Sequence, residues 1–212
     1  MGGEDFFVAP SNAEAVAWVE RWPNWPGTAL AIVGPQGAGK THLAHVFQAQ
    51  SHAPVITAPI LREEGADGVL ERQPALVLED VEAFMGAGLE EELLHLYNLA
   101  TEGGVKLLLT AKTPPARWGI ALKDLSSRLN TAQVAEIRAP DDALLTALIV
   151  KQFADRQLGV DQDVLTYMLA RMDRSFAGVR DLIKAIDEAA LAQKRAITIP
   201  LVRRVLEHIL EA

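Results

Sequence analysis

Eight consecutive residues, at positions 34–41, constrain the fold of this chain more than any other feature of its sequence. They match the pattern G-x-x-x-x-G-K-[ST] and lie between an apolar run, Ala29–Val33, and a helical pattern at 40–50. In that setting the glycines let backbone N–H groups turn inward around phosphate oxygens, Lys40 reaches the β- and γ-phosphates, and the Thr41 hydroxyl can ligate Mg²⁺. The pattern therefore predicts a P-loop that binds ADP or ATP. Its residues are Gly34, Pro35, Gln36, Gly37, Ala38, Gly39, Lys40 and Thr41, with His42 following in the helix.

Short apolar runs alternate with helical patterns over the first 138 residues. Helices are expected at 40–50 and 89–100, and they separate runs that have the character of buried strands. This alternation is typical of βαβ units, so we expect an α/β domain in which a parallel sheet is covered on both faces. The expected strands are Ala29–Val33, 54–57, Ala75–Leu78, 105–110 and 134–137.

After Pro140 the strand signal disappears and helical periodicity replaces it. Ser175 is a candidate N-cap for one helix, and Thr198 with Pro200 has the form of another helix start. Residues 139–212 are therefore expected to form a small all-helical domain. Another expected helix carries its apolar residues at i, i+1, i+4, i+5 and i+8: Val164, Leu165, Met168, Leu169 and Met172.

Composition excludes several classes of function. Against 28 Asp and Glu the chain has only 20 Lys and Arg, a formal net charge of −8, which is the wrong sign for binding DNA mainly through its phosphates. Since cysteine is absent, disulfides and thiolate metal sites are excluded, as suits a reducing compartment. The longest mostly apolar run, 143–150, is far shorter than the ~20 residues that span a bilayer, and no basic region precedes an apolar stretch at the N-terminus. We expect a cytoplasmic protein that makes no direct sequence-specific contact with DNA.

Two carboxylates follow the third expected strand. A P-loop requires an acidic residue on a neighbouring strand to hold the water shell of Mg²⁺, and Glu79 and Asp80 come directly after Ala75–Leu78. We assign Glu79 to the metal together with Thr41, and Asp80 to the orientation of a water molecule. The alternative is that both acids simply end a strand in solvent.

Further segments follow the P-loop in a characteristic order. Together with 34–41 they resemble the AAA+ region of the DnaA family of bacterial replication initiators, over nearly the whole chain. The resemblance implies an AAA+ sheet domain at 1–138, a helical lid domain at 139–212, and bound ADP or ATP with Mg²⁺. The segments that carry it are residues 42–44, 78–80, 107–110, the prolines at 114 and 115, 124–129 and 179–182.

The resemblance also implies roles for residues outside the P-loop. Phe7 and Val8 match a strip that lies beside the adenine base in that family. Arg180, in the Val-Arg-Asp-Leu segment of the lid, is expected to sense the nucleotide bound to its own chain. Arg128, in the Ser-Ser-Arg-Leu segment, precedes the last expected strand and is expected to be an arginine finger that enters the site of a neighbouring molecule.

Two positions depart from the family pattern. The usual AAA+ order after the third strand is Asp then Glu, whereas this chain has Glu79 then Asp80, so we expect weak intrinsic hydrolysis at most. After the strand at 105–110 the family commonly has an acidic sensor residue, and this chain has Lys112 in that segment.

The ends of the chain indicate which branch of the family it resembles. DnaA continues into a DNA-binding domain after the helix opened by Thr198, whereas the regulatory inactivators of DnaA end there. Those inactivators carry a short clamp-binding peptide at the extreme N-terminus, and residues 1–7 contain no such motif. We expect a regulator that uses Arg128 to stimulate hydrolysis of DnaA-bound ATP, together with the sliding clamp of the DNA polymerase, with self-association as a further possibility. An independent AAA+ ATPase such as a helicase loader, and a DNA-binding initiator, are the alternatives.

Three remaining features are expected to be structural. The tryptophan-rich segment 18–25 should close the N-terminal helix onto the core rather than stack a nucleic-acid base. Three consecutive glutamates at 90–92 should form a solvated helix N-terminus that the macrodipole favours. His42 and His45 share a helix face but have no third ligand in view, so we expect no metal there.

Overall fold

Two compact units, Met1–Arg138 and Ala139–Ala212, make up the chain. The structure is a computed structural model that describes residues 8–71, 73–193 and 196–211. Each unit has its own hydrophobic core.

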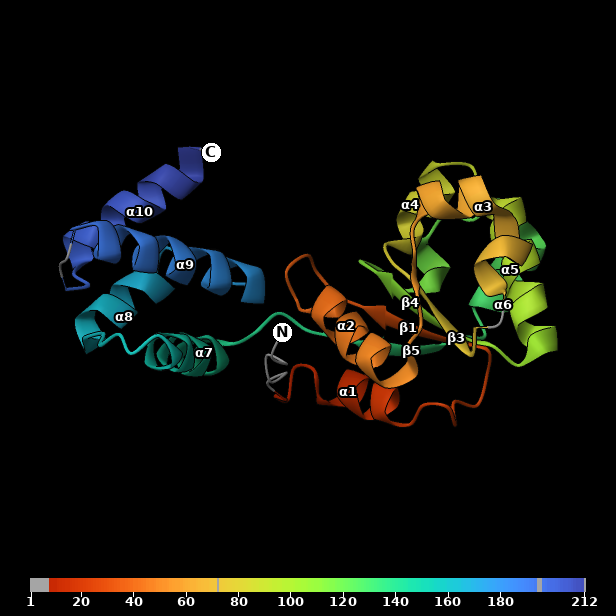
Figure 1. The fold of residues 1–212 in the computed structure, drawn as a ribbon, viewed down its shortest axis with the longest axis horizontal. Helices are drawn as coiled ribbons and strands as arrows, with labels where there is room; N and C mark the ends of the chain where they lie inside the picture. The colour runs from red at the N-terminus through yellow and green to blue at the C-terminus, as the bar shows by residue number, and fades with distance from the viewer. Residues whose placement is uncertain (1–7, 72, 194–195, 212) are drawn as a thin grey trace. The chain divides into compact units, whose positions relative to one another are not determined.

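A five-stranded parallel sheet forms the centre of the first unit, in the order β2-β3-β4-β1-β5 (Figure 1). All four pairings of neighbouring strands are parallel, which confirms the predicted α/β class. The P-loop strand β1 lies between β4 and β5, and β5 is an edge strand. The strands are β1 (Ala29–Val33), β2 (Val55–Ile56), β3 (Ala75–Leu78), β4 (Lys106–Ala111) and β5 (Gln133–Glu136).

Alternate residues of the central strands pack into two separate layers. In β1, Ala29, Ala31 and Val33 face one layer, while Leu30 and Ile32 face the other. Every residue of β1 and β3 is buried, because helices cover both faces of the sheet. This is why these strands are continuous apolar runs rather than alternating ones.

Helices occupy both faces of the sheet (Figure 1). One layer contains buried residues of α1 and α2, and the other contains those of α3, α4, α5 and α6. The short 3₁₀ helix η1 (Pro115–Arg117) lies in the connection between β4 and α6. The α-helices are α1 (Ala13–Glu20), α2 (Lys40–Ser51), α3 (Ala58–Leu70), α4 (Val81–Gly86), α5 (Glu90–Gly103) and α6 (Lys123–Leu129).

The tryptophan-rich segment packs against α2, as predicted. Trp25 stacks on Phe47 with ring centroids 5.3 Å apart, and Trp22 meets the same ring edge-on at 5.9 Å. The Trp25 Nε1 donates a hydrogen bond to the Trp18 carbonyl at 2.7 Å. These rings therefore close α1 onto α2.

In the described residues of the second unit the helices are α7 (Asp142–Asp155), α8 (Gln162–Leu169), α9 (Phe176–Gln193) and α10 (Ile199–Glu211). The apolar residues predicted for α8 and the turn after it pack into this unit's core. Ser175 Oγ accepts a hydrogen bond from the Gly178 N–H at 2.9 Å, which confirms Ser175 as the N-cap of α9. Among the helices of the described residues, none is both long and apolar enough to cross a membrane.

Candidate nucleotide-binding site

The predicted P-loop connects β1 to α2 and closely approaches neighbouring backbone. Gly37 and Gly39 have φ angles of 73° and 99°, which residues other than glycine rarely adopt. Gly34 donates its N–H to the Ala111 carbonyl at 3.2 Å, and a Cβ added to it would lie 2.2 Å from the carbonyl oxygen of Ile137. The loop therefore begins between the ends of β4 and β5, where only glycine fits.

Replacing Gly34 with Ala is expected to destabilise this unit by roughly 1–3 kcal/mol, because the obstructing atom belongs to the backbone and the loop must move. Weaker nucleotide binding should accompany this loss of stability. Gly27→Ala is the matched control at the opposite end of β1, since its Cβ would meet nothing within 4 Å. Urea unfolding and an ADP titration of both variants test this; equal stability and equal affinity for Gly34→Ala and the parent would contradict it.

Lys40, the first residue of α2, is held over the start of the loop. Its Nζ donates hydrogen bonds to the carbonyls of Gly34 at 2.8 Å and Pro35 at 2.9 Å. Burial lowers the pKa of Lys40, and the nearby carboxylates of Glu82, Asp80 and Glu79 act in the opposite direction. A partly desolvated ammonium with neutral carbonyl partners is well suited to bind an anion such as a phosphate.

Nucleotide affinity should fall as the pH rises into the alkaline range. Bound phosphates favour the charged form of Lys40 and so raise its pKa. At any pH where Lys40 of the unliganded protein is partly deprotonated, nucleotide binding therefore takes up protons. That deprotonation begins at lower pH than for a lysine with the ordinary pKa of 10.5, because the pKa of Lys40 is lowered. Calorimetric ADP titrations between about pH 8 and about pH 10 measure the slope. In Lys40→Met the slope should disappear, and a parent affinity that is constant across this range would contradict the assignment.

Thr41 and Glu79 meet at the carboxyl end of β3. The Thr41 hydroxyl donates to Glu79 Oε1 at 2.5 Å, joining the second residue of α2 to the first residue after β3. No group of three or more His, Cys, Asp or Glu side chains that could hold a metal occurs among the described residues. A hydroxyl and a carboxylate nevertheless suit Mg²⁺ bound with phosphate, because Mg²⁺ keeps several of its waters in such sites.

Asp80 adopts an unusual backbone conformation beside this pair. Its φ of 55° and ψ of 63° lie in the left-handed region, and its N–H donates to Thr110 Oγ1 at 3.0 Å. Such conformations are uncommon for residues other than glycine and are frequent at functional sites. The exposed side chain of Asp80 lies at the N-terminus of α4, next to Glu79.

Glu82, which the sequence analysis did not select, holds the loop that follows β4. Its Oε2 accepts the Lys112 N–H at 2.9 Å, and its Oε1 accepts the N–H and hydroxyl of Thr113 at 3.0 and 2.8 Å. A carboxylate is therefore present near the family's acidic sensor position, but it comes from α4. No local sequence signal distinguishes Glu82, because its partners Lys112 and Thr113 lie 30 residues or more further along the chain.

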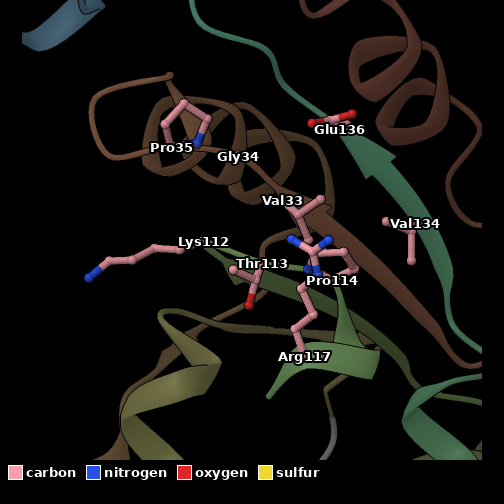
Figure 2. Close-up of a pocket in the computed structure, with 9 residues that line it drawn as sticks. All are labelled: Val33, Gly34, Pro35, Lys112, Thr113, Pro114, Arg117, Val134 and Glu136. Atoms are coloured by element: carbon pink, nitrogen blue, oxygen red, sulfur yellow. The ribbon is translucent and has the colours of Figure 1, made fainter. Parts of the chain in front are cut away.

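A pocket of about 300 Å³ adjoins the start of the P-loop at the carboxyl ends of β1 and β4 and alongside β5 (Figure 2). The Arg117 guanidinium points toward Val33, while the Lys112 side chain extends away from the other labelled residues (Figure 2). Ligands of open parallel sheets commonly bind at the carboxyl ends of the strands. The pocket is lined by Val33, Gly34, Pro35, Lys112, Thr113, Pro114, Arg117, Val134 and Glu136.

Arg128 lies in the last turn of α6 with an exposed side chain. Within the described part of the chain its guanidinium has no hydrogen bond or ion pair. The end of the helix is well fixed, because the Arg128 carbonyl accepts the Thr131 hydroxyl at 2.6 Å and both Leu125 and Leu129 are fully buried. A free guanidinium is thus presented on a firmly packed helix.

The structure gives the following surroundings for the remaining predicted site residues. Arg180 belongs to the second unit, where it is the fifth residue of α9, just past the first turn, and pairs with the exposed Asp181 at 3.1 Å. Val8 is 56% exposed, and His42 is half-buried in the first turn of α2. Phe7 lies outside the described residues.

Known proteins resemble this chain in its lid sequence and in its fold. Residues 141–206 match the model of the Hda lid domain. Domain III of the replication initiation protein DnaA from Thermotoga maritima superposes with a TM-score of 0.81 at 20% identity, over 97% of this chain and 95% of that one. AMPPCP-bound DnaA from Aquifex aeolicus gives 0.74 at 20% identity, over 87% of this chain and 64% of that one. The ADP complex of the FIGL-1 AAA domain gives 0.64 at 15% identity, over 97% and 83%.

The fold and the loop between β1 and α2 are those of an AAA+ protein, with a parallel sheet domain and a helical lid domain. Within that class the chain is similar in fold to DnaA, and residues 141–206 match the Hda lid domain. The resemblance found in the sequence is thereby confirmed.

Proposed function

We propose that this protein is a nucleotide-binding regulator of replication initiation that stimulates hydrolysis of DnaA-bound ATP. The observation that carries the proposal is Arg128, an exposed guanidinium with no partner among the described residues, on a helix whose apolar side is buried. An arginine that stabilises its own domain would normally pair with a carboxylate or a carbonyl. The Hda-type lid and the similarity to DnaA support DnaA as the neighbouring molecule.

The protein's own nucleotide is proposed to bind at the P-loop as ADP or ATP with Mg²⁺. Backbone N–H groups of residues 36–39 and the Lys40 ammonium would bind phosphate oxygens, and Thr41 and Glu79 would hold the metal. Bound metal supplies charge neutralisation at the phosphates. Phe7 and Val8 are proposed to lie beside the base, His42 to follow the loop at the phosphates, and Arg180 to contact the nucleotide from the lid. The AMPPCP in the Aquifex aeolicus neighbour supports a nucleotide at this fold position.

Intrinsic hydrolysis is proposed to be weak. Asp80 would orient the attacking water, but its carboxylate is one methylene shorter than the glutamate usual at this position of AAA+ proteins. The longer side chain of Glu79 is instead engaged by Thr41. These positions favour a nucleotide that shapes the protein over one that it turns over rapidly.

The sliding clamp of the DNA polymerase is the second proposed partner. Its support is the match to the Hda lid, because the regulatory inactivators that the chain resembles act together with the clamp. Such a complex would operate in the cytoplasm, and self-association through Arg128 and the P-loop of a second copy is compatible with it. The net charge of −8 argues that contact with DNA is made through these partners.

A comparison of three ATPase assays tests this function: the protein alone, the protein with ATP-loaded DnaA, and the same mixture with DNA-loaded clamp. We expect slow turnover alone, and faster loss of DnaA-bound ATP in the mixtures, most of all with the clamp. Rapid turnover by the protein alone, unaffected by DnaA, would instead indicate the independent ATPase.

A further inference from the structure

Glu90, the first residue of α5, does not behave as the solvated glutamate that the sequence analysis expected. Its Oε1 accepts the Ala121 N–H at 3.1 Å, and its Oε2 accepts the Leu122 N–H at 2.7 Å. Its side chain is half-buried, whereas Glu91 and Glu92 are exposed. The expectation was therefore wrong for Glu90, because backbone that lies 31 residues further along the chain replaces water around this carboxylate.

The two N–H groups that Glu90 binds lie directly before α6. Leu122 is the N-cap residue of that helix, and its side chain makes no capping hydrogen bond. Arg128 follows Leu122 by six residues, or about 9 Å along a helix axis. A shift or rotation at the start of so short a helix is therefore transmitted to the Arg128 guanidinium.

Apolar packing alone does not fully fix the position of α6 on the core. Leu125 and Leu129 hold α6 against the core, but apolar contacts are non-directional, so they resist separation more than sliding or rotation. Two hydrogen bonds from consecutive N–H groups to one carboxylate are directional and charge-assisted. They fix the start of α6 relative to α5.

We propose that Glu90 is a positioning residue for Arg128, acting by holding the Ala121 and Leu122 N–H groups so that α6 presents the arginine to the partner's nucleotide. The proposal rests on the function proposed for Arg128. Glu90 itself is 38 residues from Arg128 in the sequence and is assigned no contact with nucleotide or partner.

Glu90→Gln is the informative substitution, with Glu91→Gln and Glu92→Gln as matched controls. All three remove one negative charge from the first turn of α5, so they alter the interaction with the helix macrodipole similarly. Only Glu90→Gln places an amide NH₂ where one of the two N–H groups needs an acceptor.

Amide hydrogen exchange tests the anchor without any partner. In Glu90→Gln the Ala121 and Leu122 amides should exchange roughly tenfold faster or more, while both controls match the parent. Amides of the buried strand β1, such as Leu30, report global unfolding and should be unchanged in all variants. Unchanged protection of Ala121 and Leu122 in Glu90→Gln would overturn the proposal, as would equal acceleration in a control.

Hydrolysis of DnaA-bound ATP then tests whether Glu90 positions Arg128. We expect Glu90→Gln to lower the maximal stimulated rate roughly tenfold, with the half-saturating concentration of this protein and its own ADP affinity unchanged. An unchanged maximal rate, or an equal loss in Glu91→Gln, would overturn the role. If the parent itself fails to stimulate DnaA, the proposed function is contradicted, whereas the exchange comparison still decides whether Glu90 anchors α6.

Discussion

Arg128→Ala is expected to abolish stimulation of DnaA-bound ATP hydrolysis while leaving this protein folded and able to bind ADP. An arginine finger neutralises charge that develops on the transferred phosphoryl group, and one supplied by a neighbour accelerates hydrolysis by about 10³- to 10⁵-fold. The Arg128 side chain is exposed and has no partner among the described residues, so its removal costs its own domain little. The measurements are stimulated turnover, ADP affinity and the unfolding temperature.

Two further variants sharpen this prediction. Arg128→Lys should also fail to stimulate hydrolysis of DnaA-bound ATP, because a compact ammonium does not reproduce the planar guanidinium fork. Lys123→Ala removes a positive charge from the first residue of the same helix and should stimulate normally. The finger assignment is contradicted if Arg128→Ala stimulates as well as the parent, or if its unfolding temperature falls together with its activity.

Lys40→Ala is expected to weaken ADP binding by roughly tenfold or more. The change removes charge-assisted contacts to phosphate worth about 1.5–3 kcal/mol, with the lower end favoured where solvent screens the group. It also frees the carbonyls of Gly34 and Pro35, so the unliganded loop loses the contacts that hold its start. Isothermal titration calorimetry measures the affinity directly.

Lys106→Ala is the matched control for that measurement. The Lys106 ammonium also donates to two backbone carbonyls, those of Trp25 at 3.2 Å and Gly27 at 2.8 Å, but it lies at the start of β4, the opposite end of the sheet from the P-loop. Both variants lose a lysine that bridges carbonyls, and only Lys40→Ala should lose nucleotide. Equal ADP affinity in the parent and Lys40→Ala would contradict the assignment of residues 34–41 as the phosphate-binding loop.

Most of the secondary structure around the site could be predicted because its causes are local. The strands β1 and β3 have the predicted bounds, since a parallel strand buried on both faces is a continuous apolar run. Ser175 was identifiable as an N-cap because its hydroxyl serves an N–H only three residues away. The edge strand β2 is shorter than predicted, at two residues, because Pro54 has no N–H to donate and Thr57 is already the N-cap of α3.

Several decisive contacts had no local signature. Glu82 and Glu90 resemble other glutamates near helix starts, and only the fold brings each to backbone N–H groups about 30 residues away. The requirement for glycine at position 34 likewise arises from Ile137, a residue remote in sequence.

The sequence by itself determined the chemistry available: the phosphate-binding loop, the two acids after β3, the lid periodicity and an arginine in a family motif. These follow from residue types at fixed short spacings, which the backbone geometry of loops, strands and helices converts directly into local structure. Only the tertiary structure decided that Thr41 meets Glu79, that Glu82 holds the loop after β4, and that Arg128 has no partner within the described part of the chain. Those outcomes depend on which distant segments the hydrophobic core brings together, and a hydrogen bond across 30 or more residues forms only once that packing has fixed both ends.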